Sequence, residues 1–154
     1  MSAARDPAAG QVADFISRYA PEMAAALSAC RKKLRARITR GYELVYDNYN
    51  ALAIGYAYAD KASASLVSIA GYPRWVTLFF LYGSGLPDPE GLLEGDGVRV
   101  RSIRLASPDD LDRPAVHRLL DLALALHESD FAAAPPLKTV IKSIAAKQRS
   151  RRPL

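Results

Sequence analysis

The residues best suited to hold a ligand are aromatic. Tyr46, Tyr56, Tyr58 and Trp75 fall on segments expected to be strands, and the tyrosines bring hydroxyl groups among apolar side chains. Small-molecule pockets combine apolar walls with a few polar groups that orient the ligand. The set therefore fits a ligand cleft, and it equally fits a cross-strand aromatic cluster that only stabilises a sheet.

Two arginines extend this candidate site. Arg99 and Arg101 lie on one face of an expected strand, with Arg104 further along it. Guanidinium groups bind carboxylates and phosphates through paired hydrogen bonds. The segment just before them is acidic, so the simpler expectation is that these arginines pair with their acidic neighbours.

The loop GSGLPDPEGLLEGDG, residues 83–97, resembles a glycine-rich phosphate loop at first sight. A phosphate loop supplies consecutive free N–H groups and usually a lysine. Here Pro87 and Pro89 lack N–H groups, and no basic residue lies between Gly83 and Val98. Phosphate would also be repelled by the four carboxylates of the loop, Asp88, Glu90, Glu94 and Asp96. Nucleotide binding is therefore not expected at this loop.

The same four carboxylates do not follow the ligand spacing of an EF-hand loop. We expect a single-turn helical connector in which Asp88 caps the turn, Pro89 begins it and Gly95 ends it. A metal site formed by the four carboxylates is the weaker alternative.

Nucleophilic catalysis requires a nucleophile, a base and an orienting group in contact. Cys30 lies on the apolar stripe of an expected helix, where a thiol is usually inert. His117 and His127 lie on one expected helix at a spacing unlike that of a metal pair, and His117 is placed to contact Asp121 four residues later. No catalytic residues can be named, and we expect neither enzymatic activity nor a cofactor.

Charge is distributed unevenly along the 154 residues. The net charge is +5, yet residues 31–40 carry six basic side chains without an acid, and residues 138–154 carry six more. The rest of the chain has a net charge of −7. The C-terminal cluster (Lys147, Arg149, Arg151 and Arg152) could contact nucleic acid or a protein partner, but short basic clusters are common and a solvated tail is favoured.

Hydrophobic periodicity predicts the elements that position these residues. Two helices open the chain, over Val12–Ala20 and from Pro21, the second with Leu27, Cys30, Leu34 and Ile38 on its buried stripe. Period-two patterns then predict strands at 42–47, 51–59, 65–72, 74–82 and 98–105. Two helices are expected to close the chain, one beginning near Pro108 or Pro114 and one over 137–148.

Grouped strands of this kind indicate an α+β domain built on an antiparallel meander of about five strands. The small residues Ala51, Ala53, Gly55 and Ala57 share one face of their strand, and a helix is expected to approach the sheet there. The segment 74–82 is apolar on both faces, which predicts a central strand covered on both sides.

A family resemblance is carried by GYELVYDNYNALAIGYA and by YPRWVTLFFLYGSGLPDPEGLLEGDGVRVRSIRL. These stretches resemble the bacterial YdhG-like domain family, a domain of unknown function, and the similarity runs from about Val12 to His127. The ending VIKSIAAKQRSRRP is similar to one subgroup. The resemblance implies a small α+β domain with an antiparallel sheet flanked by helices.

Part of that family is associated with frataxin-like iron handling, which relies on an acidic ridge on an early helix. The early helices here carry only Asp14 and Glu22. Iron binding is therefore the alternative function rather than the main one.

The sequence thus predicts a disordered terminus at 1–11, a YdhG-like α+β domain at 12–130, and a C-terminal helix with a basic tail at 131–154. We expect a cytoplasmic, non-catalytic module that binds a small ligand or a protein partner. No membrane association is expected, since no apolar run approaches the roughly 20 residues of a membrane helix. Nucleic-acid association through the tail is the weakest alternative.

Overall fold

The computed structural model describes residues 7–154. The helices are α1 (Pro7–Ser17), α2 (Pro21–Arg37), α3 (Pro114–Ala125) and α4 (Glu128–Ala133), with 3-10 turns at Ala62–Ala64, Gly83–Gly85 and Pro108–Asp112. The strands are β1 (Tyr42–Asp47), β2 (Leu52–Ala57), β3 (Ser65–Gly71), β4 (Val76–Phe80), β5 (Arg101–Leu105) and β6 (Lys138–Ile144).

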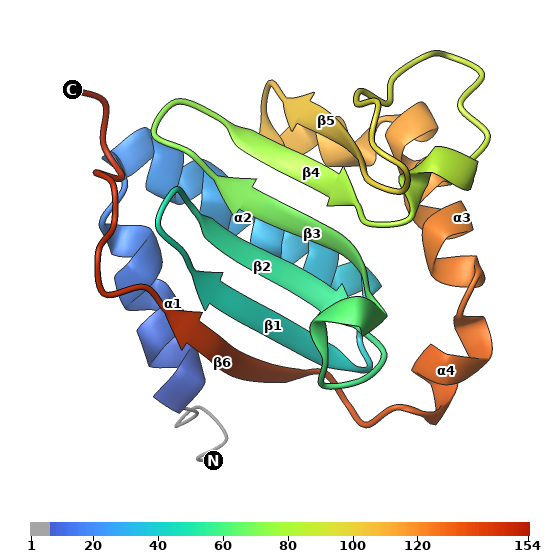
Figure 1. Cartoon of the computed structure of the whole chain (residues 1–154), viewed down its shortest axis with the longest axis horizontal. Coiled ribbons are helices and arrows are strands. Elements are labelled where there is room, and N and C mark those ends of the chain that lie inside the picture. Colours follow the sequence, from blue (N-terminus) through green and yellow to red (C-terminus); the bar gives the residue numbers. More distant parts are fainter. Residues whose placement is uncertain (1–6) are drawn as a thin grey trace.

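The six strands form one mixed sheet in the order β5-β4-β3-β2-β1-β6 (Figure 1). β1 to β5 are an antiparallel meander, as the sequence predicts, in which each strand pairs with the strand before it in the chain. β6 adds a sixth strand that runs parallel to β1 at the edge of the sheet. The α+β class is confirmed, and the purely antiparallel five-strand sheet is corrected to a mixed sheet of six.

The C-terminal helix expected over 137–148 is wrong. Val140 and Ile141 pair in register with Leu44 and Val45 of β1. The apolar residues of this segment recur at helical spacing, but the segment is short and rich in β-branched side chains, which also suit a strand. The segment forms a strand because it pairs with the edge of β1 that β2 leaves open.

The helices cover only one face of the sheet (Figure 1). Leu27, Cys30 and Leu34 of α2 are buried in one core with Ile54 and Tyr56 of β2. The predicted stripe of α2 is thus confirmed, but the helix packs on the large side chains of β2 rather than on its small-residue face. The helices also cover β4 on one face only, so the predicted coverage of this strand on both sides is wrong (Figure 1).

Close approach of helix and sheet occurs at Gly71 instead. A Cβ at this position would lie 2.8 Å from Cδ2 of Leu27 and 3.1 Å from the ring of Tyr19. The Tyr19 hydroxyl donates to the Gly71 carbonyl and accepts from the Leu52 N–H, at 2.5 Å and 3.1 Å. The glycine that the packing requires is therefore at the end of β3.

Two helix boundaries also differ from the sequence prediction. α1 begins at Pro7, so residues 7–11 are helical rather than disordered, and the remainder of that predicted terminus, residues 1–6, lies outside the described residues. α3 ends at Ala125 and His127 precedes α4, so His117 and His127 lie on different elements.

A buried carboxylate ties α2 to three strands. Glu43 of β1 is 0% exposed and accepts hydrogen bonds from Arg31, Tyr56 and Thr139 at 2.8–2.9 Å. Arg35 also donates to it, at 2.6 Å. Burial alone would raise the pKa of this carboxyl, but the hydrogen bonds and charge of Arg31 and the charge of Arg35 outweigh it and hold the pKa below its usual value.

Candidate anion-binding groove

The second buried carboxylate of β1 holds the C-terminal tail. Asp47 is 1% exposed, and its oxygens accept from Arg151 at 2.9 Å, Arg18 at 3.1 Å and Gln148 at 2.9 Å. Arg151, itself only 4% exposed, also donates to the Asn48 carbonyl at 2.6 Å. A basic tail trailing into solvent is therefore wrong for Arg151, whose charge is neutralised inside the protein.

Further contacts keep the tail against the turn that follows β1. The Arg149 N–H donates to the Tyr49 carbonyl at 2.8 Å, and the Ala145 N–H donates to the Asp47 carbonyl at 2.8 Å. The tail then runs beside the β3–β4 hairpin at the left of Figure 1. Segments about 75 residues apart in sequence thus form the two sides of one groove.

The groove has a volume of about 600 Å³. Its walls are Asn50, the hairpin residues 72–75, and the tail residues 149–150 and 152–154. The hairpin is a tight turn closed by a hydrogen bond of 2.8 Å from the Tyr72 N–H to the Trp75 carbonyl. Its volume lies within the range of about 300–1,000 Å³ that is usual for ligand pockets.

Positive charge dominates the groove. Arg74, Arg149 and Arg152 line it, and no Asp or Glu is among its lining residues. Within residues 7–154, Arg74 makes no hydrogen bond or ion pair. The guanidinium of Arg149 contacts only the Asn50 side chain, at 3.4 Å, and that of Arg152 contacts only the Arg18 carbonyl, at 3.2 Å. Three guanidinium charges therefore lack a carboxylate partner in this part of the structure.

Two aromatic rings complete the wall. The ring centroids of Tyr72 and Trp75 are 5.6 Å apart, with an interplanar angle of 31°. The guanidinium carbon of Arg104 lies 3.9 Å from the Trp75 ring centroid, and Arg104 also has no carboxylate partner among the described residues. This arrangement offers apolar ring surface next to four arginines.

The aromatic set predicted as a ligand site does not converge. Tyr56 is buried beneath α2 and bound to Glu43. Tyr46 packs with Leu44 on the opposite face of the sheet, where its hydroxyl is buried without a hydrogen-bond partner. Tyr58 is stacked on His127 with centroids 4.7 Å apart. Of the predicted set, only Trp75 lines the groove.

Arg99 and Arg101 do not join Trp75 either. The Arg99 guanidinium lies 5.4 Å from the ring centroid of Tyr82, and Arg101 donates to the Gly97 and Val100 carbonyls at 2.6 Å and 2.8 Å. Neither forms an ion pair with the acidic loop in the described structure, so the expected local pairing is wrong. A ring takes the place of the carboxylate for Arg99, and backbone carbonyls do so for Arg101.

The acidic loop forms a turn that Asp88 caps. The two Asp88 carboxylate oxygens accept from the N–H groups of Leu92 and Leu93, each at 2.9 Å. Gly91, with φ 64°, closes the turn, whereas the predicted helical turn ending at Gly95 is absent from this segment. No group of three or more His, Cys, Asp or Glu in residues 7–154 is arranged to hold a metal, Asp88, Glu90, Glu94 and Asp96 included.

The candidate catalytic residues remain apart. Burial raises the pKa of the Cys30 thiol to about 11, so this cysteine is neutral near pH 7. His117 contacts Asp121 at 3.4 Å, as the sequence predicts, and both also contact Arg37. His127 pairs with Asp130 at 2.8 Å. Neither histidine contacts a nucleophile.

Sequence reasoning missed Asp47 and Arg74 as parts of a site, and it grouped Arg104 with Arg99 and Arg101 rather than with Trp75. Asp47 looked like the last residue of a strand before a turn, and Arg74 like the polar tip of a hairpin. The available signal was the excess of arginine without a nearby acid in 72–75 and 147–152. That signal identifies a basic surface only once the two segments are known to be neighbours.

Comparisons with protein-family models, with curated proteins and with solved structures find no match to this chain. Among residues 7–154, no helix has the length and apolar character needed to cross a bilayer.

Proposed function

We propose that this chain is a non-catalytic module that binds a small organic anion bearing a planar ring, in the groove beside the C-terminal tail. The observation that carries the proposal is the set of four arginines without carboxylate partners around the Tyr72–Trp75 pair. An anionic ligand would supply the negative charge that these arginines lack.

The chemistry of the groove supports this class of ligand. Guanidinium groups form paired hydrogen bonds with carboxylates and phosphates, and such charge-assisted bonds are about twice as strong as neutral ones. The ring of the ligand would contact the aromatic wall, where stacked or tilted aromatic pairs add about 0.5–1.5 kcal/mol beyond their buried area. Phosphate and carboxylate share this chemistry.

The contacts of Ser150, an aliphatic hydroxyl in the groove, favour a binding role over catalysis. Ser150 donates to the Arg152 carbonyl at 3.0 Å and accepts from the Arg152 N–H at 3.1 Å. It has no histidine or carboxylate partner among the described residues, so no base is placed to activate it.

Single-stranded nucleic acid is the second candidate ligand. Exposed bases stack on aromatic side chains while basic groups follow the phosphates. Lys147, Arg149 and Arg152 on one exposed tail, next to Trp75, favour it. Phosphate neutralisation would make the affinity fall with salt at a slope of about −0.7 per contacted phosphate.

We also propose, on the sequence resemblance, that the domain is YdhG-like. The α+β architecture with helices beside an antiparallel meander supports that assignment. The frataxin-like iron alternative has weaker support, because the Asp88 carboxylate is already occupied by two backbone N–H groups.

Isothermal titration calorimetry with phenyl phosphate, benzoate, phenol and inorganic phosphate tests the proposed ligand class. We expect the ring-bearing anions to bind, with phenol and inorganic phosphate weaker. Arg74→Gln should weaken binding about 10-fold or more, because one charge-assisted hydrogen bond contributes about 1.5–3 kcal/mol. Arg113→Gln is the matched control, since Arg113 is an exposed arginine at the start of α3.

Failure of every ring-bearing anion to bind, or an equal loss in the Arg113 variant, would overturn the proposal. Binding of an oligonucleotide with a steep salt slope, without binding of phenyl phosphate, would establish the second candidate instead.

A further inference from the structure

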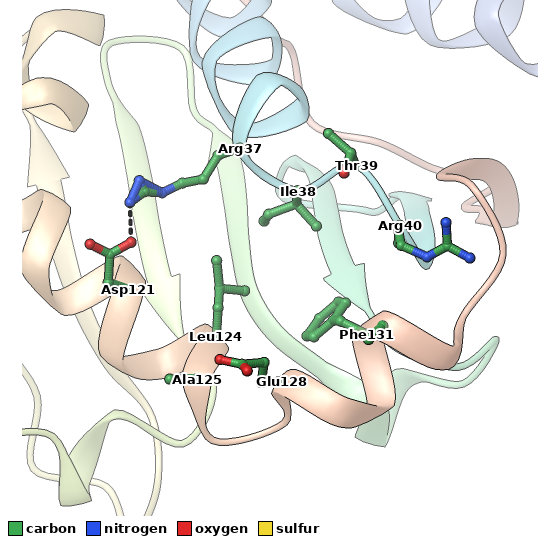
Figure 2. A pocket seen from close by; sticks show the side chains of 10 residues that line it. Arg37, Ile38, Thr39, Arg40, Asp121, Leu124, Ala125, Glu128 and Phe131 are labelled. Carbon is green, nitrogen blue, oxygen red and sulfur yellow. Dashed lines mark hydrogen bonds and ion pairs between the residues drawn. The ribbon is translucent and has the colours of Figure 1, made fainter.

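A second cavity lies on the opposite side of the molecule from the tail groove. It has a volume of about 460 Å³ and lies between the C-terminal end of α2 and the α3–α4 segment. Figure 2 shows its apolar wall, formed by Ile38, Leu124 and Phe131. Ile38 is buried and belongs to the main core, while Leu124 and Phe131 are only partly buried. Apolar surface is therefore available to a ligand here.

Two of the charged groups at this cavity already have partners. The Arg37 guanidinium pairs with Asp121 and also contacts the ring nitrogens of His117, at 2.9 Å and 3.2 Å. Figure 2 shows the Arg37–Asp121 pair at one end of the apolar wall. These two charges neutralise each other, so they do not select the charge of a ligand.

The other two charged groups lack ionic partners. The Glu128 side chain makes no hydrogen bond or ion pair within the described residues. The Arg40 guanidinium donates to the Ala134 carbonyl but contacts no carboxylate there. In Figure 2, Glu128 lies beside Ala125, and Arg40 lies beyond Phe131 at the other end of the wall. One negative and one positive charge are thus separated by apolar side chains.

We propose that this cavity binds an extended zwitterion, a molecule whose ammonium and carboxylate groups are separated by an apolar segment. Its ammonium pairs with Glu128, its carboxylate pairs with Arg40, and its apolar segment covers Leu124 and Phe131. Short apolar peptides and ω-amino acids share this chemistry. The site is independent of the tail groove, because the two cavities have no lining residue in common.

The charges decide against other ligands of the same size. A simple anion has no cation to pair with Glu128 and would be repelled by its carboxylate. A simple amine has no anion to pair with Arg40 and would be repelled by its guanidinium. A single α-amino acid carries both charges on groups attached to the same carbon. A molecule with its charges at two ends can place one charge at Arg40 and the other at Glu128.

Calorimetry on the full chain with capped peptides tests the proposal. Trileucine is the probe, and N-acetyl-trileucine, trileucine amide, leucine and 6-aminohexanoate are the comparison compounds. We expect trileucine to bind, and capping of either end to weaken it about 10-fold, because each cap removes one charge-assisted contact. Binding of 6-aminohexanoate alone would identify an ω-amino acid as the form of the zwitterion that the site takes.

Two variants assign the charges to their residues. Glu128→Gln should weaken trileucine about 10-fold but leave the affinity of N-acetyl-trileucine unchanged, because that ligand has no ammonium to lose. Arg40→Gln should show the same pattern with trileucine amide. Glu90→Gln and Arg113→Gln are matched controls outside the cavity and should bind like the unmodified chain.

Arg40 also supports the backbone at Ala134, so circular dichroism checks that the Arg40 variant is folded. If the Arg40 variant unfolds, two other measurements still test the zwitterion site. One is the affinity of Glu128→Gln for trileucine and for N-acetyl-trileucine, and the other is the methyl NMR shifts of Ile38 and Leu124 on titration with trileucine. The proposal is overturned if neither trileucine nor 6-aminohexanoate binds, if capping has no effect, or if the methyl shifts occur away from this cavity.

Discussion

Glu43 and Asp47 lie on the same strand, four residues apart, and both are buried carboxylates that bind two arginines. The partners of Glu43 belong to the central fold, since they come from α2, β2 and β6. Asp47 is bound by Arg18, which follows α1, and by Gln148 and Arg151 of the tail.

This difference shows that the same chemistry can serve two purposes. The Glu43 cluster connects layers that must be together for the domain to fold at all. The Asp47 cluster attaches a peripheral segment, and that segment supplies one wall of the basic groove. Perturbing Glu43 should therefore affect global stability, whereas perturbing Asp47 should chiefly affect the tail and ligand binding.

The largest expected effect is that of Glu43→Gln. This change removes the charge of the carboxylate that Arg31 and Arg35 contact, and we expect a loss of about 2–3 kcal/mol in the free energy of unfolding. The value is below the usual range for fully buried pairs because the Arg31 and Arg35 side chains are 18% and 37% exposed. Urea denaturation measures it, with Glu90→Gln as an exposed control. A loss no larger than that of the control would refute the assignment of Glu43 as the central cluster.

Acid should reproduce part of this effect. The pKa of Glu43 is lowered on folding, so its contribution to stability is complete above its unfolded pKa of about 4.3 and is lost as pH falls through the lower, folded pKa. The stability difference between the unmodified chain and Glu43→Gln should thus shrink below about pH 4. Denaturation curves at pH 7 and at lower pH values test this, and a constant difference would contradict it.

Asp47→Asn should cost less stability, about 1–2 kcal/mol, because Arg151 retains backbone carbonyl partners and the tail can detach into water. Hydrogen exchange should accelerate at the N–H groups of Ala145 and Arg149, which bind the Asp47 and Tyr49 carbonyls. Binding of phenyl phosphate should weaken as well. Asp60→Asn, which removes an exposed partner of Lys142, is the control. A loss of stability equal to that of Glu43→Gln would mean that the tail is part of the folding core.

The smallest expected effect is that of Tyr56→Phe. Its hydroxyl donates to Glu43 at 2.8 Å in a fully buried site, so we expect a loss of about 1 kcal/mol by urea denaturation. Phenyl phosphate affinity should be unchanged, because Tyr56 does not line the groove. Altered ligand affinity at unchanged stability would instead favour the tyrosine cleft that the sequence suggested.

The elements that the sequence predicted best are those with a clear period. The segment 42–47 forms β1 with the expected bounds, although Glu43 and Asp47, the polar residues of its pattern, are buried, and α2 buries the expected stripe. The segment 137–148 could be predicted either as a helix or as a strand, because Leu137, Val140 and Ile141 fit both structures. Pairing with β1, nearly 100 residues earlier, resolved that ambiguity.

The candidate site was predicted less well for a related reason. Trp75 was assigned to an aromatic cleft, whereas Arg149 and Arg152 were assigned to the basic C-terminal cluster. Arg74 carried no local signal, because a single arginine on a hairpin is an ordinary surface residue. Its significance depends on which segments lie beside it.

The sequence by itself determined the α+β class and the five-strand meander, because periodicity depends on neighbours in the chain. The tertiary structure decided which face of the sheet the helices cover, the sixth strand, and the place where unpaired arginines gather. These features depend on contacts between distant segments, above all on the burial of Asp47 with Arg151, 104 residues away. Local pattern cannot specify a partner at that separation.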